Sequence, residues 1–375
     1  MTVKIKGGTT ADISVDKALS RTQGNSFELQ DVSPIVERQT VKPGLLTAML
    51  GANINTEFLT TDKFAYDEIT HTMQLPDAKS YNDFGPRINK DKARELTFRV
   101  GSFGLSGNVS PEDYAGRRMP GTEELMTEAY LVSQINDKIT AGWDAFTELA
   151  IAQLLTTDTN INRGDTTNIA QYNFYTEIVG SSRPAATSMN LSDSAVDHYQ
   201  LFSDQKDLLE TDMEKAMMSS SEVVVICGKT FFDQRLLIEK QNGLGGSVNL
   251  SRDLRSGLDL ASMGVPEDAF GSGSGRFNYQ FFTSAIDGLT YVKYAASIQG
   301  SKLIADTAAY MIPVGAESFL RMVYAPARTK QYVNTVAQSR YGWSDEDDRN
   351  GVTLWTESNV LPFNAYPELV RHLTV

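Results

Sequence analysis

The sequence contains one cysteine, three scattered histidines and no long apolar run. Cys227 is the only thiol in 375 residues, so an internal disulfide and every zinc site built on several cysteines are excluded. His71, His198 and His372 lie far apart and form no HExxH pair. No stretch of about 18 apolar residues is present, so no membrane-spanning helix is expected. The N-terminal segment MTVKIKGGTTADISVDK also lacks the apolar centre of a signal peptide.

Positive charge is also scarce. The chain has 34 Lys and Arg against 47 Asp and Glu, which gives a formal net charge of −13. General nucleic-acid binding requires an excess of cations to neutralise phosphates, so this balance argues against it. The hydrophobic share of 41% and the charged share of 22% are typical of globular proteins. The length favours two compact domains, or one domain with long appendages.

Two polar stretches near the N-terminus contain few apolar side chains that could form a core. The first forty or so residues mix Gly, Thr, Asp and Ser with isolated apolar positions, which predicts an extended arm. A short helix over Leu45–Leu50 and a strand over Phe58–Ile69 follow. His71–Leu75 and Leu96–Val100 have the pattern of two strands on either side of a long polar run. Because a compact domain rarely holds so long a loop, we expect a projecting two-stranded arm or a functional loop.

The second half of this polar run concentrates positive charge. We call its cations the basic island: Arg87, Lys90, Lys92, Arg94 and Arg99. Only Asp91 and Glu95 lie among them. Such a run is often a solvated face, but its place on a projecting arm makes contact with another subunit an equal alternative.

The strongest periodic signal lies in residues 122–156. Apolar or nearly apolar side chains recur at 125, 129, 132, 135, 139, 143, 146, 150 and 154, a mean spacing of about 3.6 residues. Thr122 is expected to cap this helix, and Glu123 and Glu124 suit its positive N-terminal end. A helix from Thr122 to Thr156 would be about 50 Å long. We therefore expect a rod with a sheet packed along one face.

The sequence after residue 156 predicts a mixed α/β region followed by a β-rich region. Short strands are expected around Tyr172–Val179, a helix over Ala195–Met218, a buried strand over Val223–Cys227 and a helix over Phe231–Lys240. Residues 243–275 are rich in Gly and Ser and predict a mobile loop. Later strands are expected at Arg276–Ile286 and Leu289–Ile298, which flank an Asp287-Gly288 turn, and at Tyr310–Val314, Ser318–Ala325, Tyr332–Gln338, Val352–Glu357 and Leu369–Val375.

No motif predicts chemistry. Gly228-Lys229-Thr230 would need a glycine at 223 to form a phosphate-binding loop, and Val223 stands there. The run Glu346-x-Asp348-x-Asn350-Gly351-x5-Glu357 nearly matches a calcium loop, but it begins with Glu and no helix precedes it. The glycines of GSGSG follow no strand. Cys227 is expected to lie in a buried strand, where thiols are inert. We therefore assign no catalytic, cofactor-binding or metal-binding residue.

The order of elements resembles the major capsid protein of tailed bacteriophages, with the Hong Kong phage-type shell fold and the lambda-like branch nearest. The similar segments are FLTTDKFAYDEI, SEVVVICGKTFFDQRLLIEKQ, LIADTAAYMIPVG followed by SFLRMVYAPA, and ESNVLPFNAYPELVRHLTV. The resemblance covers about residues 45–375.

The resemblance implies an α+β fold with four parts. Residues 1–65 would be an N-terminal arm and residues 66–104 an extended β loop that lies over a neighbour. Residues 105–199 would form a peripheral domain with a spine helix over 122–156, completed by late strands at about 316–361. Residues 200–315, completed by 362–375, would form an axial α/β domain. The lysine–asparagine crosslink of one branch has no matching local pattern here.

The function implied is that of a structural shell protein in the virion, assembled in the host cytoplasm and not an enzyme. Its partners would be copies of itself in pentamers and hexamers, together with scaffold, portal and possibly decoration proteins. Packaged double-stranded DNA would be contacted weakly and without sequence specificity, and no cofactor or membrane would be involved. The alternatives are a bacterial nanocompartment shell of the same fold and, from another class, a cytosolic α/β enzyme.

Overall fold

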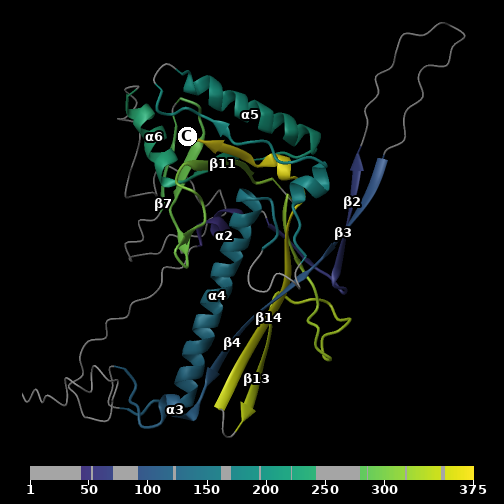
Figure 1. Cartoon of the computed structure of the whole chain (residues 1–375), viewed down its shortest axis with the longest axis vertical. Helices are drawn as coiled ribbons and strands as arrows, with labels where there is room; N and C mark the ends of the chain where they lie inside the picture. The colour runs from purple at the N-terminus through teal and green to yellow at the C-terminus, as the bar shows by residue number, and fades with distance from the viewer. Residues whose placement is uncertain are drawn as a thin grey trace, which may run out of the picture. The chain divides into compact units, whose positions relative to one another are not determined.

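The described part of the chain forms two compact units. The computed structural model describes residues 44–51, 54–70, 92–120, 124–161, 170–193, 196–220, 222–241, 279–284, 286–316, 319–347 and 351–375. Of these, residues 104–144 and 342–357 belong to unit 1, and the others belong to unit 2. Helix α4 (Glu128–Thr156) and strand β14 (Gly351–Asn364) each continue from one unit into the other (Figure 1).

Unit 1 is built on the first half of α4. Strand β14 pairs there with β4 (Gly101–Val109) and β13 (Tyr341–Asp347). A Cβ added to Gly107 of β4 would lie 2.4 Å from Cγ2 of Ile135 on α4, so the helix packs against this strand almost at backbone distance. Trp143 Nε1 donates to Thr356 Oγ1 at 3.0 Å, which joins the helix to β14. A short helix, α3 (Pro111–Tyr114), carries a capping box made by Ser110 and Asp113.

In unit 2, the five-stranded sheet that contains β14 includes the first described strand and one late strand. Strand β1 (Ile54–Phe58) lies parallel to β12 (Leu320–Tyr324), with Ile54 opposite Leu320. Strand β12 pairs in turn with the last residues of β14, antiparallel, with Leu320 opposite Asn364. A separate ribbon consists of β2 (Lys63–Thr70) and β3 (Lys92–Arg99), paired antiparallel from Lys63↔Arg99 to Thr70↔Lys92.

The core of unit 2 is a six-stranded mixed sheet. Its order is β5 (Thr187–Ser188), β15 (Arg371–Thr374), β11 (Ala308–Val314), β6 (Glu222–Cys227), β8 (Thr290–Tyr294) and β7 (Tyr279–Thr283). Strand β11 is buried along its whole length, as a continuous apolar run requires. Strands β6 and β8 are parallel, and α6 (Lys229–Gln241) follows β6 directly.

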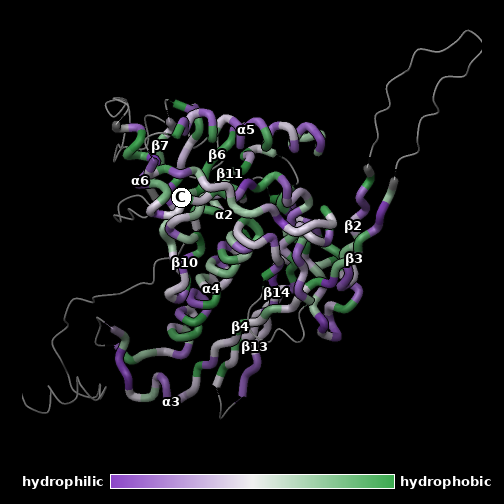
Figure 2. The backbone as a smooth tube through the Cα atoms, turned by 45° about the horizontal axis from the view of Figure 1, so that its top comes forward, coloured by the Kyte–Doolittle hydropathy of each residue, from purple (hydrophilic) through white to green (hydrophobic). Residues whose placement is uncertain are grey.

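Helix α5 (His198–Lys215) is amphipathic and packs beside this sheet. Figure 2 shows hydrophilic and hydrophobic residues alternating along it. The side chain of Asp197 accepts from the N–H of Gln200 at 3.2 Å and so caps its N-terminus. Phe202 is fully buried and meets the rings of Phe231 and Tyr291 edge-on. The smaller elements are α2 (Leu45–Leu50), η2 (Tyr175–Val179), β9 (Ser297–Ile298), β10 (Ser301–Lys302) and η5 (Pro367–Leu369).

Several expected elements are confirmed. They are the helix at Leu45–Leu50, the buried strand at Val223–Cys227, the helices at 195–218 and 231–240, and the hairpin at Asp287-Gly288, where Thr283 lies opposite Thr290. The 3.6-residue spacing of the long helix is also confirmed, because Ile139, Trp143, Ala150 and Leu154 are all buried.

Other expectations were wrong in detail. The long helix begins at Glu128, because Arg118 and Leu125 form an antiparallel bridge and Leu125 is 69% exposed. Residues 175–179 form a π-helix instead of strands, and residues 332–338 form a turn followed by irregular backbone instead of a strand. The expected strand at 58–69 is two strands, β1 and β2, with different partners. Strand β4, rich in glycine, was missed, and so was β13. The expected strand over His71–Leu75, Thr122 and the whole 243–275 loop lie outside the described residues.

Candidate functional site: a charged surface and its buried supports

The basic island does not form one continuous surface in the described residues. Arg87 and Lys90 lie outside them, and of Lys92 only the backbone, at the start of β3, is described. Arg94 donates to the backbone carbonyl of Glu177 in the same subunit. Arg99 forms an ion pair with Asp62 at 3.5 Å. Because side chains alternate along a strand, Arg94 and Arg99 lie on opposite faces of the ribbon.

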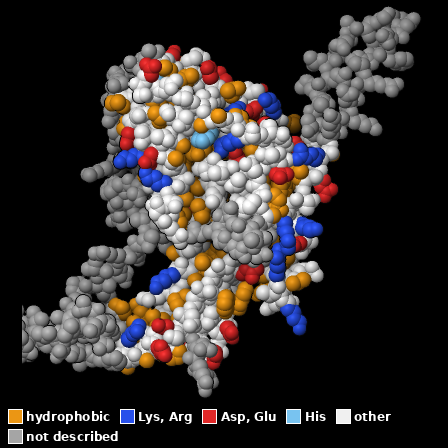
Figure 3. Space-filling view, viewed as in Figure 1, with side chains coloured by type: hydrophobic (Ala, Val, Ile, Leu, Met, Phe, Trp, Pro, Cys, Tyr) orange, Lys and Arg blue, Asp and Glu red, His pale blue; other side chains and the backbone are white. Residues whose placement is uncertain are grey.

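A second cationic surface adjoins the base of the ribbon. Lys63 lies directly opposite Arg99, and Arg328 reaches the same Asp62 at 3.8 Å. Lys330 follows two residues later and is exposed. We call Lys63, Arg99, Arg328 and Lys330 the basic patch, and Asp62 pairs with two of its cations, Arg99 and Arg328. Viewed as in Figure 1, Figure 3 shows Lys and Arg side chains gathered over the loop that follows β12.

Sequence reasoning missed this patch. The loop over residues 325–340 was interpreted partly as a strand, although it has three cations, Arg328, Lys330 and Arg340, and no acidic residue. That local imbalance in an acidic chain was the available signal. Its connection to Lys63 and Arg99, more than 200 residues earlier, needed the fold.

The loop that carries Arg328 is held firmly. Ala337 N–H donates to the carbonyl of Leu59 at 2.8 Å, and Asn359 Nδ2 donates to the carbonyl of Pro326 at 2.9 Å. The rings of Tyr332 and Tyr341 are 4.8 Å apart. The loop therefore presents its cations on a preformed surface.

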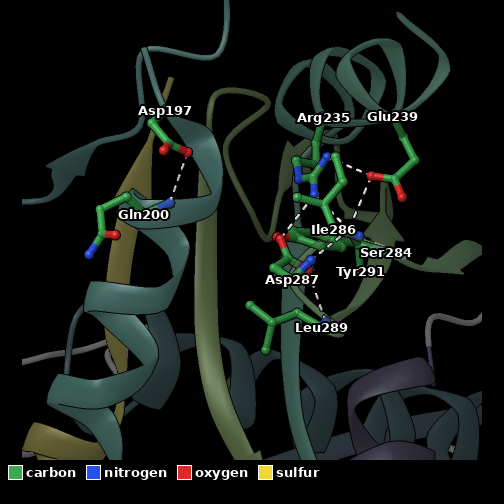
Figure 4. A network of polar contacts seen from close by, with 9 residues as sticks. All are labelled: Asp197, Gln200, Arg235, Glu239, Ser284, Ile286, Asp287, Leu289 and Tyr291. Atoms are coloured by element: carbon green, nitrogen blue, oxygen red, sulfur yellow. Dashed lines mark hydrogen bonds and ion pairs between the residues drawn. The ribbon is translucent and has the colours of Figure 1, made fainter. Parts of the chain in front are cut away.

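A buried polar network fixes the β7–β8 hairpin to α6 (Figure 4). Arg235 is fully buried and donates to Glu239 at 2.9 Å, to Ser284 at 2.7 Å and to Asp287 at 2.9 Å. Tyr291 adds a 2.7 Å bond to Asp287, and burial raises the pKa of its hydroxyl. Both Arg235 and Glu239 precede residues 242–278, and Ser284 follows them. The network thus pins the chain on either side of that segment.

A second buried carboxylate clamps the short helix α2. Glu148 of α4 is fully buried. Its Oε1 accepts from Leu46 N–H at 2.9 Å and from the Tyr294 hydroxyl at 2.7 Å. Its Oε2 accepts from the N–H and the hydroxyl of Thr47 at 2.9 and 2.7 Å. The first N–H groups of a helix lack acceptors within the helix. The carboxylate of Glu148 accepts hydrogen bonds from two of these N–H groups in α2, although it lies about 100 residues later in the sequence.

A third buried acid lies at the end of α4. Asp158 is fully buried at a positive φ of 52° and pairs with Arg183 Nε at 3.2 Å. Burial raises the pKa of Asp158 to about 7, against the opposing effect of Arg183. Arg183 also donates to the last carbonyls of α4, at Leu155 and Thr156. The cluster ties the helix end to the sheet edge, where His372 stacks on Tyr310 at 4.8 Å.

The weak motifs have structural explanations where they are described. A Cβ on Gly228 would lie 2.0 Å from the carbonyl oxygen of Ala305, and Phe231 N–H donates to the carbonyl of Asp306. Backbone carbonyls therefore occupy the start of α6, where a phosphate would need to bind. Glu346 and Glu357 lie on the consecutive strands β13 and β14, instead of on a helix–loop–helix. Cys227 is buried, which raises the pKa of its thiol well above the ordinary value.

Neither a cluster of metal ligands nor a membrane-spanning helix occurs in the part of the chain that the structure describes. The described residues contain no group of three or more His, Cys, Asp or Glu side chains placed to hold a metal ion. None of their helices is both long enough and apolar enough to cross a membrane.

Known proteins similar to this chain are phage capsid proteins. The family model for phage major capsid protein E matches residues 28–375. The major capsid protein of Pseudomonas phage KPP10 is 22% identical over 373 residues, which covers 92% of this chain and 96% of the relative.

Two solved structures share the fold. A protein assigned as the capsid protein of an Escherichia coli CFT073 prophage has a TM-score of 0.54 at 13% identity, with 100% and 99% of the two chains covered. The mature capsid of bacteriophage PhiM1 has a TM-score of 0.52 at 9% identity, with 92% and 91% covered. The shared fold is the tailed-phage capsid fold, of mixed α and β content, as the sequence predicted.

Proposed function

Because the chain belongs to the phage major capsid protein E family, it is a structural protein of the phage head shell, and we propose that it assembles as pentamers and hexamers into an icosahedral shell around double-stranded DNA. The observation that carries this conclusion is the family match, which extends over residues 28–375. The protein is a component of the virion, and its match to phage proteins favours a head over a nanocompartment shell.

The elements of the two described units support the proposed division of the chain into an extended loop, a peripheral domain and an axial domain. The β2–β3 ribbon suits the extended loop proposed for residues 66–104, and α4 with β4, β13 and β14 suits the peripheral domain. The six-stranded sheet with α5 and α6 suits the axial domain. Rings form when one face of a subunit meets a different face of the next, so such a chain needs several distinct surfaces. Scaffold, portal and decoration proteins remain further proposed partners. Contact with DNA would be weak because the net charge is −13.

The assembly state tests the proposal directly. Purified protein should sediment as pentamers, hexamers or closed particles, and negative-stain microscopy should show rings or shells. The measurement should cover a range of salt concentrations, with and without the neighbouring head proteins of the phage. A chain that stays monomeric at micromolar concentration in every condition would contradict the proposal.

The basic island remains a candidate for subunit contact. Arg94 and Arg99 already have partners in their own subunit, so the sharper test uses Lys90 and Lys92. We expect Lys90→Glu with Lys92→Glu to leave the circular dichroism spectrum unchanged and to lower the yield of shells. A matched control, Lys138→Glu with Lys229→Glu, changes the net charge equally at exposed positions of α4 and α6. If both variants assemble like the wild type, the island is a solvated face.

A further inference from the structure

The basic patch carries more positive charge than its own subunit compensates. Lys63 and Arg99 are directly opposed on the ribbon, where like charges destabilise a strand pair. Among the residues that the structure describes, the only carboxylate that forms an ion pair with the patch is Asp62, which is shared between Arg99 and Arg328 at 3.5 and 3.8 Å. The patch therefore has four cations but only one ion-paired acid among the described residues, although the chain as a whole has a net charge of −13.

Apolar side chains lie on the same segments as these cations. Val333 and Val336 of the Arg328 loop are 51% and 64% exposed, and Phe58, four residues before Asp62, is 46% exposed. Val333 lies in a turn and Val336 in irregular backbone, so neither belongs to a strand. Exposed apolar groups beside arginines are the composition of a protein–protein contact, whereas a surface for nucleic acid would be more uniformly cationic.

The complementary surface is on the edge strand β13. Among the described strands, β13 pairs only with β14, so its other edge is open. Its last six residues are all exposed and include Asp345, Glu346 and Asp347. They belong to the longest acidic run in the sequence, DEDD. Trp343 on the same strand and Trp355 on β14 are 39% and 43% exposed, which adds aromatic surface to the acids.

We propose that the basic patch of one subunit binds the acidic strand β13 of a second copy of this chain, a contact that rests on the proposed shell function. Carboxylates of Asp345 and Glu346 would meet the guanidinium and ammonium groups of the patch, and the exposed tryptophans offer faces to arginine. The two surfaces differ, so the contact is heterologous and repeats from copy to copy around a ring.

The acidic side chains of β13 also explain how its open edge avoids unwanted pairing with other strands. An exposed edge strand is a template for pairing with any other strand. Two β13 strands from different copies would repel each other through their carboxylates, whereas a cationic surface would be attracted. The charge therefore selects the partner as well as strengthening the contact.

Charge reversal tests the pairing. Variant A is Arg328→Glu with Lys330→Glu, variant B is Asp345→Lys with Glu346→Lys, and variant AB combines them. We expect A and B each to raise the concentration needed for assembly by about tenfold, because several weak contacts per particle are lost together. Variant AB should restore assembly, since the charges are again complementary. Circular dichroism and thermal melting of each variant verify that the subunit is folded.

A fourth variant separates contact from total charge. Variant AB has the same net charge as the wild type, and so does a combination of A with Asp207→Lys and Glu210→Lys, two exposed acids of α5. We expect this combination to remain defective. Recovery in it equal to that of AB would overturn the proposal, because net charge alone would then account for rescue.

The remaining outcomes are distinguishable. If the wild type assembles and variants A and B assemble equally well, the pairing is wrong while the shell function stands. If variant A assembles normally but its particles retain less DNA, the patch serves phosphate and the proposal is also overturned. If the wild type never assembles, the proposed function itself fails.

Discussion

Asp158 is a residue whose chemistry depends on its burial. An isolated carboxyl titrates near 4, but here burial raises its pKa to about 7, although Arg183 opposes the rise. The folded state therefore holds a proton that the unfolded chain releases between about pH 4 and 7. Its contribution to stability is complete below the unfolded pKa and is lost as pH rises through the folded one.

We therefore expect the unassembled subunit to lose stability from pH 4.5 to 7 relative to an Asp158→Asn variant. The slope of the difference should approach about 1.4 kcal/mol per pH unit and flatten above pH 7. Urea unfolding at several pH values measures it. Asn has nearly the same size as Asp and tolerates the positive φ at this position. Burial lowers the pKa of His372, but this histidine titrates in both proteins, so its effect cancels in the difference between them. A difference that does not vary with pH would show that Asp158 is ionised throughout.

Glu148 illustrates a carboxylate used as a structural acceptor. Each of its oxygens accepts two bonds, so replacement by Gln puts an amide NH2 where two donors already point. We expect Glu148→Gln to destabilise the subunit by about 2–3 kcal/mol, because buried donors lose a charged partner. Limited proteolysis should show faster cleavage near α2, since its anchor is weakened. Gln134→Glu, a change of similar size on the same helix, should leave that cleavage rate unchanged.

These residues could not have been assigned from sequence. Glu148 meets Leu46 across 102 positions and Tyr294 across 146, and nothing local in the helix distinguishes it from a solvated glutamate. Arg235 is similar, since its partners Ser284 and Asp287 lie about 50 residues away. Short-range spacing predicted that α4 and α6 exist, but not which polar side chains would turn inward.

At the scale of elements, the predictions held where one periodicity dominated. Helix α4 repeats apolar residues over 29 positions, and β6 is a continuous apolar run. The failures occurred where local patterns were ambiguous. In η2, Phe174, Tyr175 and Ile178 are buried at helical spacing within a segment too short to show a period. Strand β4 contains three glycines, at 101, 104 and 107, and glycine normally weakens a strand prediction.

Gly107 has a specific reason to be in a strand. A Cβ there would lie 2.4 Å from Cγ2 of Ile135, and a β-branched side chain in a helix has almost no freedom to move away. We expect Gly107→Ala to cost about 1–3 kcal/mol through overpacking. Ile135→Ala in the same chain should recover part of that loss, because it removes the opposing methyl.

Chemical denaturation of the two single variants and the double variant forms a cycle that isolates the contact. A coupling energy near zero would mean that α4 does not pack on β4 at this point. Gly104→Ala serves as a control, because its added Cβ would lie 3.5 Å from the Thr356 carbonyl oxygen, which is an ordinary contact distance.

At the scale of the whole molecule, two electrostatic effects of opposite sign act on assembly. Every subunit carries a formal charge of −13, so subunits repel one another at long range. Local contacts between oppositely charged surfaces attract at short range. Salt screens the long-range repulsion first, since the Debye length falls from about 30 Å at 0.01 M to about 8 Å at 0.15 M.

We therefore expect shell yield to pass through a maximum as NaCl is raised. From about 0.01 to 0.15 M the repulsion is screened and yield should rise, whereas towards 1 M, where the Debye length is about 3 Å, the exposed ion pairs weaken and yield should fall. Light scattering at fixed protein concentration measures the profile. Variant A, Arg328→Glu with Lys330→Glu, should show the rise in shell yield at low salt but no fall towards 1 M. It lacks the favourable charge contact at the patch that high salt would weaken. A wild-type yield that only increases with salt would mean that apolar burial alone holds the subunits together.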